Sequence, residues 1–233
     1  MTAQSSNKAD VLLVAASAPD FIGFCGHLGE RIEGNLRGLS IRSKLIGFGG
    51  IHAASATSRG ILATQPRAVI FVGTAGLYPG PVSAEPCEVV VGTEVVTIDV
   101  GVLHGHAEWP FGVHRNLKAH PAIVGGFLSV RPHLKTMRVG SPAAFTRNDG
   151  LARLIPSQGN VELENTEAYG VALAAASSNC PFACVLGISH LVGSTAHIDQ
   201  PRFHRGAVER VAELVIAWLE LAAPGLPFRR NEP

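Results

Sequence analysis

Residues 161–190, VELENTEAYGVALAAASSNCPFACVLGISH, decide the fold. Small residues with two packing positions dominate 168–176, and this composition predicts a helix. Asn-Cys-Pro ends that helix, and the continuous apolar run 182–188 predicts a buried strand. Ser189-His190 follows at the carboxyl end of this strand, where open α/β sheets bind ligands. The unit therefore places an acidic helix start beside a polar strand end, which predicts a functional site.

Similar apolar runs along the chain predict further strands and helices. The predicted strands cover 11–16, 45–50, 68–76 and 136–145, with two more strands and a bend within 86–102. The predicted helices cover 21 to about 36, 51–62 and 206–222. The last helix is amphipathic, with its apolar residues on one face. Residues 103–120 and 191–205 are expected to be loops.

Composition predicts one compact domain and excludes some functions. The chain has 233 residues, of which 46% are hydrophobic and 16% are charged, so it can bury a large core. A net charge of +1 without a basic tract argues against nucleic-acid binding. No apolar run reaches the ~20 residues that a membrane helix needs. The polar start is unlike a signal peptide, and the expected location is cytoplasmic.

The cysteines follow no spacing that is typical of a disulfide framework or a metal site. Cys180 and Cys184 flank a predicted turn, while Cys25 and Cys87 are isolated in the sequence. We therefore expect buried free thiols, which suit a reducing compartment. His104 and His106 have no third ligand at a suitable spacing, and we expect no metal and no cofactor.

Residues 164–172, ENTEAYGVA, resemble a motif of the nucleoside phosphorylase and nucleosidase superfamily. That superfamily includes purine and uridine phosphorylases, methylthioadenosine/adenosylhomocysteine nucleosidase and futalosine hydrolase. Thr166 stands where the motif has Met, Glu167 matches its Glu, and Ser189-His190 stands where a strand ends in Ser-Asp or Ser-Asn. Ser189 follows Glu167 by 22 residues, as in the superfamily.

The resemblance implies the fold class and the partners. It covers about residues 11–222 and implies one α/β domain over residues 1–233. This domain would have three layers, with a mixed, partly closed central β-sheet flanked by helices. The resemblance also implies a small-molecule nucleoside substrate and a homo-oligomer, most simply a dimer, with no nucleic-acid or membrane partner.

The resemblance also implies a set of substrate-binding residues. Residues 73–76, GTAG, are similar to a turn that contacts phosphate or ribose, and they implicate Thr74 and Gly76. Phe145 corresponds to a phenylalanine that stacks on the base; the alternative is a core residue. Thr166 and Ser189 complete this set, and the 103–120 loop would fold over the pocket and line it with aromatic residues.

Three residues are the catalytic candidates by this resemblance. Asp20 would position the attacking water, or it merely caps a helix. Glu167 would hold the ribose hydroxyls and stabilise developing positive charge, or it interacts with a helix dipole. Glu164 is the second candidate for that role. His190 replaces an aspartate or asparagine and would assist the departing base. The loop after it, residues 191–193, resembles that of futalosine hydrolase and of the asparagine-containing members, which favours a base other than plain adenine.

Phe71, two residues before the GTAG turn, bears on which nucleophile the protein uses. Phosphorylases of this superfamily tend to carry an arginine two residues before the first glycine, where this chain has Phe71. Phosphate in an apolar pocket needs a fixed cation, which Arg59 or Arg67 could supply only if the fold turned them inward. The sequence therefore predicts a nucleosidase that uses water. The alternatives are a phosphate-dependent phosphorylase and a catalytically silent nucleoside-binding relative.

Overall fold

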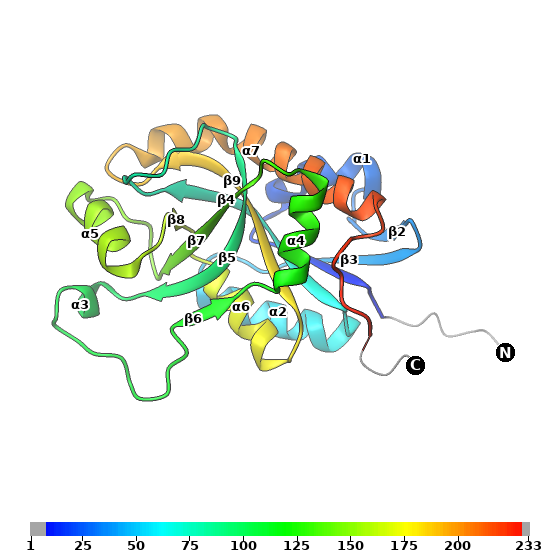
Figure 1. The fold of residues 1–233 in the computed structure, drawn as a ribbon, viewed down its shortest axis with the longest axis horizontal. Coiled ribbons are helices and arrows are strands. Elements are labelled where there is room, and N and C mark those ends of the chain that lie inside the picture. The colour runs from blue at the N-terminus through cyan, green and yellow to red at the C-terminus, as the bar shows by residue number, and fades with distance from the viewer. Residues whose placement is uncertain (1–7, 230–233) are drawn as a thin grey trace.

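A computed structural model of the protein describes residues 8–229. Within these residues nine strands form one mixed sheet between layers of helices (Figure 1). The strands are β1 Val11–Ala15, β2 Gly34–Leu36, β3 Leu39–Leu45, β4 Ala68–Leu77, β5 Val89–Ile98, β6 Asn116–Lys118, β7 Lys135–Pro142, β8 Leu163–Glu164 and β9 Phe182–Leu191. The helices are the 3-10 helix η1 Ala18–Phe24 and α1 Cys25–Leu28, α2 Gly50–Thr64, α3 Val100–Leu103, α4 Pro121–Val130, α5 Asp149–Gly159, α6 Ala168–Ser177 and α7 Ala196–Glu220.

The sheet is partly closed, as predicted. Its strand order is β2-β3-β1-β4-β8-β7-β5-β6, and β9 pairs with both β4 and β5. Strands β4, β8, β7, β5 and β9 therefore form a closed ring, from which β1, β3 and β2 extend on one side. Strand β4 runs parallel to β1 and β9 but antiparallel to β8, so the ends of several strands meet at the same edge.

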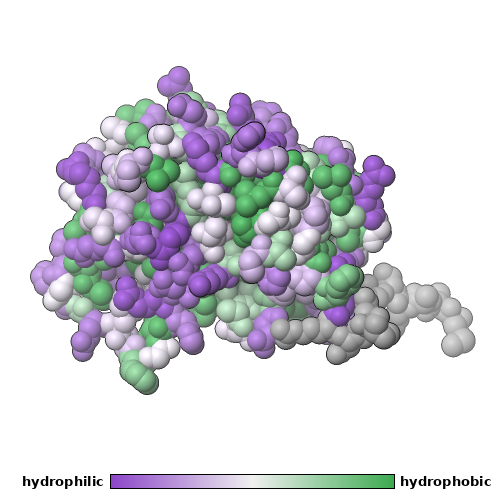
Figure 2. Space-filling view, in the orientation of Figure 1, coloured by the Kyte–Doolittle hydropathy of each residue, from purple (hydrophilic) through white to green (hydrophobic). Residues whose placement is uncertain are grey.

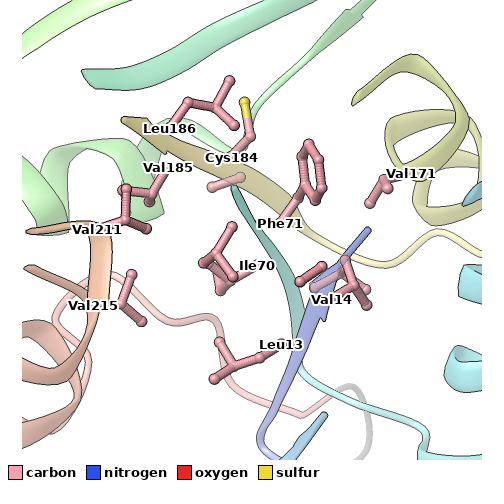
Figure 3. Close-up of a cluster of buried hydrophobic side chains, with 14 of the residues drawn as sticks. Leu13, Val14, Ile70, Phe71, Val171, Cys184, Val185, Leu186, Val211 and Val215 are labelled. Atoms are coloured by element: carbon pink, nitrogen blue, oxygen red, sulfur yellow. The ribbon is translucent and has the colours of Figure 1, made fainter. Parts of the chain in front are cut away.

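Helices cover both faces of the sheet and enclose the core. Helices α2 and α6 lie on one face, and α7 lies on the other with α4 (Figure 1). Figure 3 shows apolar side chains of β1, β4 and β9 between Val171 of α6 and Val211 of α7. The apolar face predicted for the last helix is buried, and its Trp218 stacks on Phe127 of α4 at 4.8 Å between ring centroids.

Helices α2 and α6 approach closely because both carry small residues at their contact. A Cβ on Gly170 would lie 2.1 Å from the carbonyl oxygen of Gly50 and 2.9 Å from the amide nitrogen of Ala54. Both neighbours are backbone atoms, which cannot move aside without shifting a helix. The start of α6 is thereby fixed against α2.

We expect Gly170→Ala to lower the free energy of unfolding by about 1–3 kcal/mol, because overpacking forces backbone shifts. The matched control is Gly125→Ala in α4, where a Cβ meets nothing within 4 Å on an exposed helix surface. That change should stabilise by about 0.5–1 kcal/mol, since alanine is the better helix former. Urea unfolding of both variants measures the two effects. Equal stability of the variants would contradict the tight α2–α6 packing.

Two predicted elements in the first quarter of the chain are wrong in extent. The helix predicted over 21–36 ends at Leu28, because Gly29 and Ile32 adopt positive φ angles of 71° and 50° and the chain turns into β2. The strand predicted over 45–50 lies earlier in the chain: it is β3, Leu39–Leu45, and residues 46–49 connect it to α2. Gly47 and Gly49 have φ angles of 75° and 81°, which a strand cannot accommodate.

Two later predictions need similar correction. The segment 86–102 holds one strand, β5, rather than two; a register shift between Gly92 and Glu94 absorbs the expected bend, and α3 follows. The loop predicted over 191–205 is largely helical, because α7 begins at Ala196. Pro201 and Gly206 disfavour a helix interior, but the packing of α7 on β9 and η1 outweighs that local preference.

All four cysteines are free thiols, as expected, but they are not all buried. Cys184 lies in the core, where burial raises the pKa of its thiol to about 12. Cys25 is exposed, and Cys87 and Cys180 are half-buried. The prediction of four buried thiols is therefore wrong for three of them.

Hydrophilic and hydrophobic side chains are interspersed on the face of the protein shown in Figure 2. Between Lys8 and Arg229, none of the helices combines the length and the apolar composition that crossing a membrane requires.

Candidate active site

A cavity of about 370 Å³ opens at the carboxyl ends of the parallel strands, a size typical of small-molecule sites. It collects residues from η1, the GTAG end of β4, β8, the start of α6, the end of β9 and the first turns of α7. Its lining comprises Ala16, Ser17, Pro19, Asp20, Phe48, Phe71, Val72, Gly73, Thr74, Ala75, Gly76, Phe145, Glu164, Asn165, Glu167, His190, Gln200, Pro201 and His204. The three catalytic candidates Asp20, Glu167 and His190 therefore meet in one cavity.

Asp20 takes part in the cap of η1 and also lines the cavity, so its capping contact does not remove it from the candidate site. The backbone N–H and the hydroxyl of Ser17 donate to its Oδ2 at 2.9 and 2.8 Å. Its other oxygen, Oδ1, lies 3.5 Å from Nε2 of His204 on α7. Oδ2 is thus fixed by the two donors of Ser17. Oδ1 faces His204 and can accept a hydrogen bond from a further partner.

Glu167 is held by its surroundings with one oxygen free. The N–H of Gly49 donates to Oε1 at 2.7 Å, and the hydroxyl of Thr166 donates to the same oxygen at 2.6 Å. No hydrogen bond within residues 8–229 uses Oε2. Because Glu167 lines the cavity, Oε2 is available to accept hydrogen bonds from a ligand.

Asn165, which the sequence analysis passed over, caps the start of α6. The side chain of Glu167 is therefore not needed as a cap. Its Oδ1 accepts the N–H groups of Glu167 and Ala168 at 3.0 and 2.8 Å. Its Nδ2 donates to the carbonyl oxygen of Thr74 at 3.0 Å and so ties the helix start to the end of β4. The side chain of Glu167 makes no capping hydrogen bond of its own.

The sequence placed His190 just after the end of the predicted strand 182–188. In the structure β9 continues to Leu191, so His190 lies within the strand. Gly76 makes room for the imidazole, because a Cβ there would lie 2.6 Å from Nε2 of His190. On the other side of the ring, Nδ1 lies 2.9 Å from the hydroxyl oxygen of Ser189. Burial lowers the pKa of His190 below its ordinary 6.5, and the negative charge of Asp199 partly opposes this. The imidazole is therefore neutral at pH 7.

We expect nuclear magnetic resonance to show His190 gaining its proton only below pH 6.5. Asp199→Asn should lower the midpoint further, because the carboxylate favours the imidazolium. The folded-state pKa is depressed, so the unfolded chain binds this proton first, and the free energy of unfolding should fall as the pH drops below 6.5. A His190→Asn variant identifies the resonance. A midpoint above 6.5 in the wild type would contradict the buried, neutral imidazole.

The five residues predicted to bind substrate divide into two groups. Thr74, Gly76 and Phe145 line the cavity. Phe145 is 58% exposed, so the alternative of a core phenylalanine is wrong. Thr166 and Ser189 are buried outside the lining and instead contact Glu167 and His190. The structure thus places these two hydroxyls behind the catalytic candidates.

The loop before β6 does not line this cavity, contrary to the prediction. Trp109 packs against the guanidinium of Arg115 at 5.7 Å, and Phe111 is fully exposed. The hydroxyl of Tyr169 donates to the carbonyl of His114 at 2.6 Å and holds the loop against α6. Figure 1 shows this segment, between α3 and β6, extending away from the body of the protein.

The cavity lining contains no lysine or arginine. Phe71, the residue at the position that was compared with the arginine of phosphorylases, lines the cavity. Arg67 is at the opposite end of the sheet, where it pairs with Asp10 at 3.3 Å. Arg59 is exposed on α2 and donates to the hydroxyl of Ser55. Neither arginine supplies the cation that a phosphate dianion would need.

Residues 8–229 contain no group of three or more histidine, cysteine or acidic side chains that could hold a metal ion. The rings of His104 and His106 stack on each other at 6.0 Å in an exposed loop. The cavity also contains the polar side chains of Glu164, Gln200 and His204.

His204 and Glu164 are, besides Asn165, cavity residues whose roles sequence reasoning missed. His204 lies 184 residues after Asp20 along the chain, and α7 was expected to begin only after it. Glu164 was considered only as a substitute for Glu167. In the structure it has its own partners: the hydroxyl of Tyr78 at 2.7 Å and the N–H of Thr146 at 3.1 Å.

The family model of the Phosphorylase superfamily matches residues 11–220, and the chain belongs to this superfamily. A comparison with curated protein sequences found no match.

Solved structures share the fold at low sequence identity. A futalosine hydrolase mutant of Helicobacter pylori strain 26695 is 14% identical, with a TM-score of 0.81, 91% of this chain covered and 98% of that one. A 5'-methylthioadenosine/S-adenosylhomocysteine nucleosidase from Neisseria meningitidis, in complex with methylthio-immucillin-A, is 20% identical, with a TM-score of 0.78 and the same coverage. The nucleosidase from Colwellia psychrerythraea, in complex with adenine, is 18% identical, with a TM-score of 0.80 and coverage of 95% and 98%. This similarity confirms the predicted three-layer α/β architecture.

Proposed function

We propose that this protein is a nucleosidase, which hydrolyses the N-glycosidic bond of a purine-type nucleoside and releases free base and sugar. The observation that carries the proposal is the convergence of Asp20, Glu167 and His190 on a cavity without any lysine or arginine. The similarity of the fold to a futalosine hydrolase and to nucleosidases supports the same reaction class.

Each group has a role that its surroundings permit. Asp20 accepts a proton from the water whose oxygen attacks the sugar carbon. Glu167 accepts hydrogen bonds from the ribose hydroxyls through Oε2 and stabilises the positive charge that develops on the sugar. The electrons of the breaking carbon–nitrogen bond leave with the base, and His190 stabilises the departing anion by donating a hydrogen bond to one of its ring nitrogens. The proton that Asp20 took from water then reaches the base through solvent, which gives the neutral free base. Thr74, Gly76 and Phe145 contact the nucleoside, with Thr166 and Ser189 behind them.

His204 is assigned a positioning role. Its Nε2 lies 3.5 Å from Oδ1 of Asp20, close enough to orient this oxygen or to share a water molecule with it. His204→Gln should lower kcat by about 10-fold while KM changes little, because the contact acts on Asp20 rather than on the nucleoside.

A panel of nucleosides tests the proposal. Purified protein would be incubated with methylthioadenosine, adenosylhomocysteine, inosine and futalosine, with and without phosphate, and the products identified by mass spectrometry. Free base with unphosphorylated sugar supports the nucleosidase. Sugar 1-phosphate would indicate a phosphorylase. Thermal stabilisation by a nucleoside without any product would indicate a catalytically silent binding protein.

We also propose that the protein forms a homodimer and works in the cytoplasm. Large apolar side chains are exposed near the cavity, among them Phe48, Ile51 and Phe145, and a second copy could cover them. The free thiols suit a reducing compartment. Light scattering of the purified protein measures the assembly, and a monomer at micromolar concentration would contradict the dimer.

A further inference from the structure

The cavity holds a second buried carboxylate that the proposed reaction leaves unused. Glu164 is only 3% exposed, although it belongs to the cavity lining. The hydroxyl of Tyr78 donates to its Oε2 at 2.7 Å, and the N–H of Thr146 donates to its Oε1 at 3.1 Å. Burying a carboxylate is costly unless such hydrogen bonds form, and here they also fix its orientation.

On the cavity side, Glu164 can only accept hydrogen bonds. Each carboxylate oxygen has two acceptor positions, and the two protein donors occupy one position on each oxygen. Tyr78 keeps its proton, because burial and the adjacent carboxylate raise the pKa of its phenol far above the ordinary value of 10.0. A ligand group that lies against Glu164 must therefore be an N–H or O–H donor.

The position of Glu164 associates it with the flat part of a ligand. Thr146, whose N–H donates to Glu164, directly follows Phe145, whose ring is exposed at the cavity. A planar base that stacks on the Phe145 ring therefore has one edge near the Glu164 carboxylate. Glu167, in contrast, is held by the N–H of Gly49 at the start of α2.

His190 faces Glu164 across a floor without a side chain. Gly76 in β4 is paired in register with Glu164 in β8 on one side and with His190 in β9 on the other. Adjacent strands lie about 4.8 Å apart, so the Cα atoms of Glu164 and His190 are about 10 Å apart. Nε2 is the atom of His190 that lies nearest to the open side of Gly76, the residue that separates His190 from Glu164 in the register.

The hydrogen bonds around Ser189 indicate which nitrogen of His190 carries the proton. The hydroxyl of Ser189 lies 2.9 Å from Nδ1 but 3.4 Å from the carbonyl oxygen of Ala75, which is long for an O–H···O bond. The hydroxyl proton is thus better placed on the bond to Nδ1. In the neutral ring Nε2 then carries the hydrogen and donates into the cavity.

We propose that Glu164 and His190 select a 6-oxopurine base, with the Glu164 carboxylate accepting its N1–H and His190 Nε2–H donating to the N7 and O6 edge. A 6-oxopurine offers acceptors at N7 and O6, whereas adenine carries an amino donor at position 6. Adenine also has a bare lone pair at N1, which would face the carboxylate. The inference rests on the proposed function and narrows its substrate class to nucleosides of hypoxanthine or guanine type.

Binding of free bases, measured by titration calorimetry, tests this selection without any turnover. The wild-type protein should bind hypoxanthine at least about 10-fold more tightly than adenine, because the wrong base leaves a buried group unpaired. 1-Methylhypoxanthine, which lacks the N1–H, should bind as weakly as adenine. Equal affinity for hypoxanthine and adenine, or no binding of either base by the folded protein, would overturn the inference.

Glu164→Gln should reduce the preference for hypoxanthine to below about 3-fold, because the amide can donate to N1 of adenine. The matched control is Glu162→Gln, two residues earlier, whose carboxylate accepts the backbone N–H of Arg138 outside the cavity. The control should keep the wild-type preference. A preference that survives Glu164→Gln would overturn the inference.

Tyr78→Phe provides a second variant if the Glu164 variant does not fold. Tyr78 does not line the cavity, so the change removes one donor to Glu164 and leaves the cavity wall intact. It should weaken hypoxanthine binding by about 3- to 10-fold and leave adenine binding unchanged. An unchanged ratio of the two affinities would count against a role of the carboxylate.

The proposed function and the base selection can fail separately. Selective binding of hypoxanthine without release of base from any nucleoside would refute the nucleosidase and preserve the selection. Equal cleavage of inosine and adenosine, which share their sugar, would preserve the nucleosidase and refute the selection.

Discussion

Glutamine in place of Glu167 is expected to lower kcat by about 100- to 1000-fold while the protein keeps its fold. The carbonyl oxygen of glutamine can still accept the N–H of Gly49 and the hydroxyl of Thr166. Its NH₂ group then stands where Oε2 was, so it donates where the ribose hydroxyls need an acceptor. It also removes the negative charge that stabilises the developing cation. Steady-state rates of base release measure the effect.

The control for this variant is the thermal unfolding midpoint, which should change little because the hydrogen bonds to Oε1 remain. A normal rate in a normally folded Glu167→Gln protein would remove Glu167 from the mechanism. A rate that falls only together with the unfolding midpoint would point to a purely structural carboxylate at the start of α6.

Asparagine in place of Asp20 is expected to lower kcat by about 100- to 10,000-fold with little change in KM. Asp20 acts on water, so its loss should impair the chemical step and spare nucleoside binding. The amide oxygen can still accept both donors of Ser17, and the cap of η1 should therefore survive. Single-turnover measurements separate the chemical step from product release.

Ser17→Ala distinguishes a catalytic Asp20 from a mere helix cap. This variant removes the hydroxyl that donates at 2.8 Å but leaves the backbone N–H donor at 2.9 Å. If Asp20 is the base, Ser17→Ala should lower the unfolding midpoint slightly and keep most of the activity. Equal losses of stability in both variants, with unchanged kcat in Asp20→Asn, would assign Asp20 to capping alone.

The sequence was sufficient to predict the central helix–strand unit and the cavity at its edge. Local signals caused this success: small residues and an Asn-Cys-Pro stop define α6, and a continuous apolar run defines β9. The closed ring of strands came only from the family resemblance, because pairing of β9 with both β4 and β5 leaves no mark in either strand alone.

The residues that were missed depend on contacts between distant segments. The contact of His204 with Asp20 requires α7 to begin at Ala196, and Pro201 hid that start in the sequence. The bond between Tyr78 and Glu164 links residues 86 positions apart. Thr166 and Ser189 were predicted to bind substrate, and only the packing shows that they lie outside the cavity lining, where they contact Glu167 and His190.

The sugar product formed at saturating phosphate tests the central claim most directly. The protein would be given a cleaved nucleoside with either no phosphate or about 10 mM phosphate, and the sugar would be identified by mass spectrometry. Because no lysine or arginine lines the cavity, it offers no permanently charged cation to hold a phosphate dianion, and we predict unphosphorylated sugar at the same rate in both samples. Sugar 1-phosphate, formed at a rate that rises with phosphate, would contradict the account.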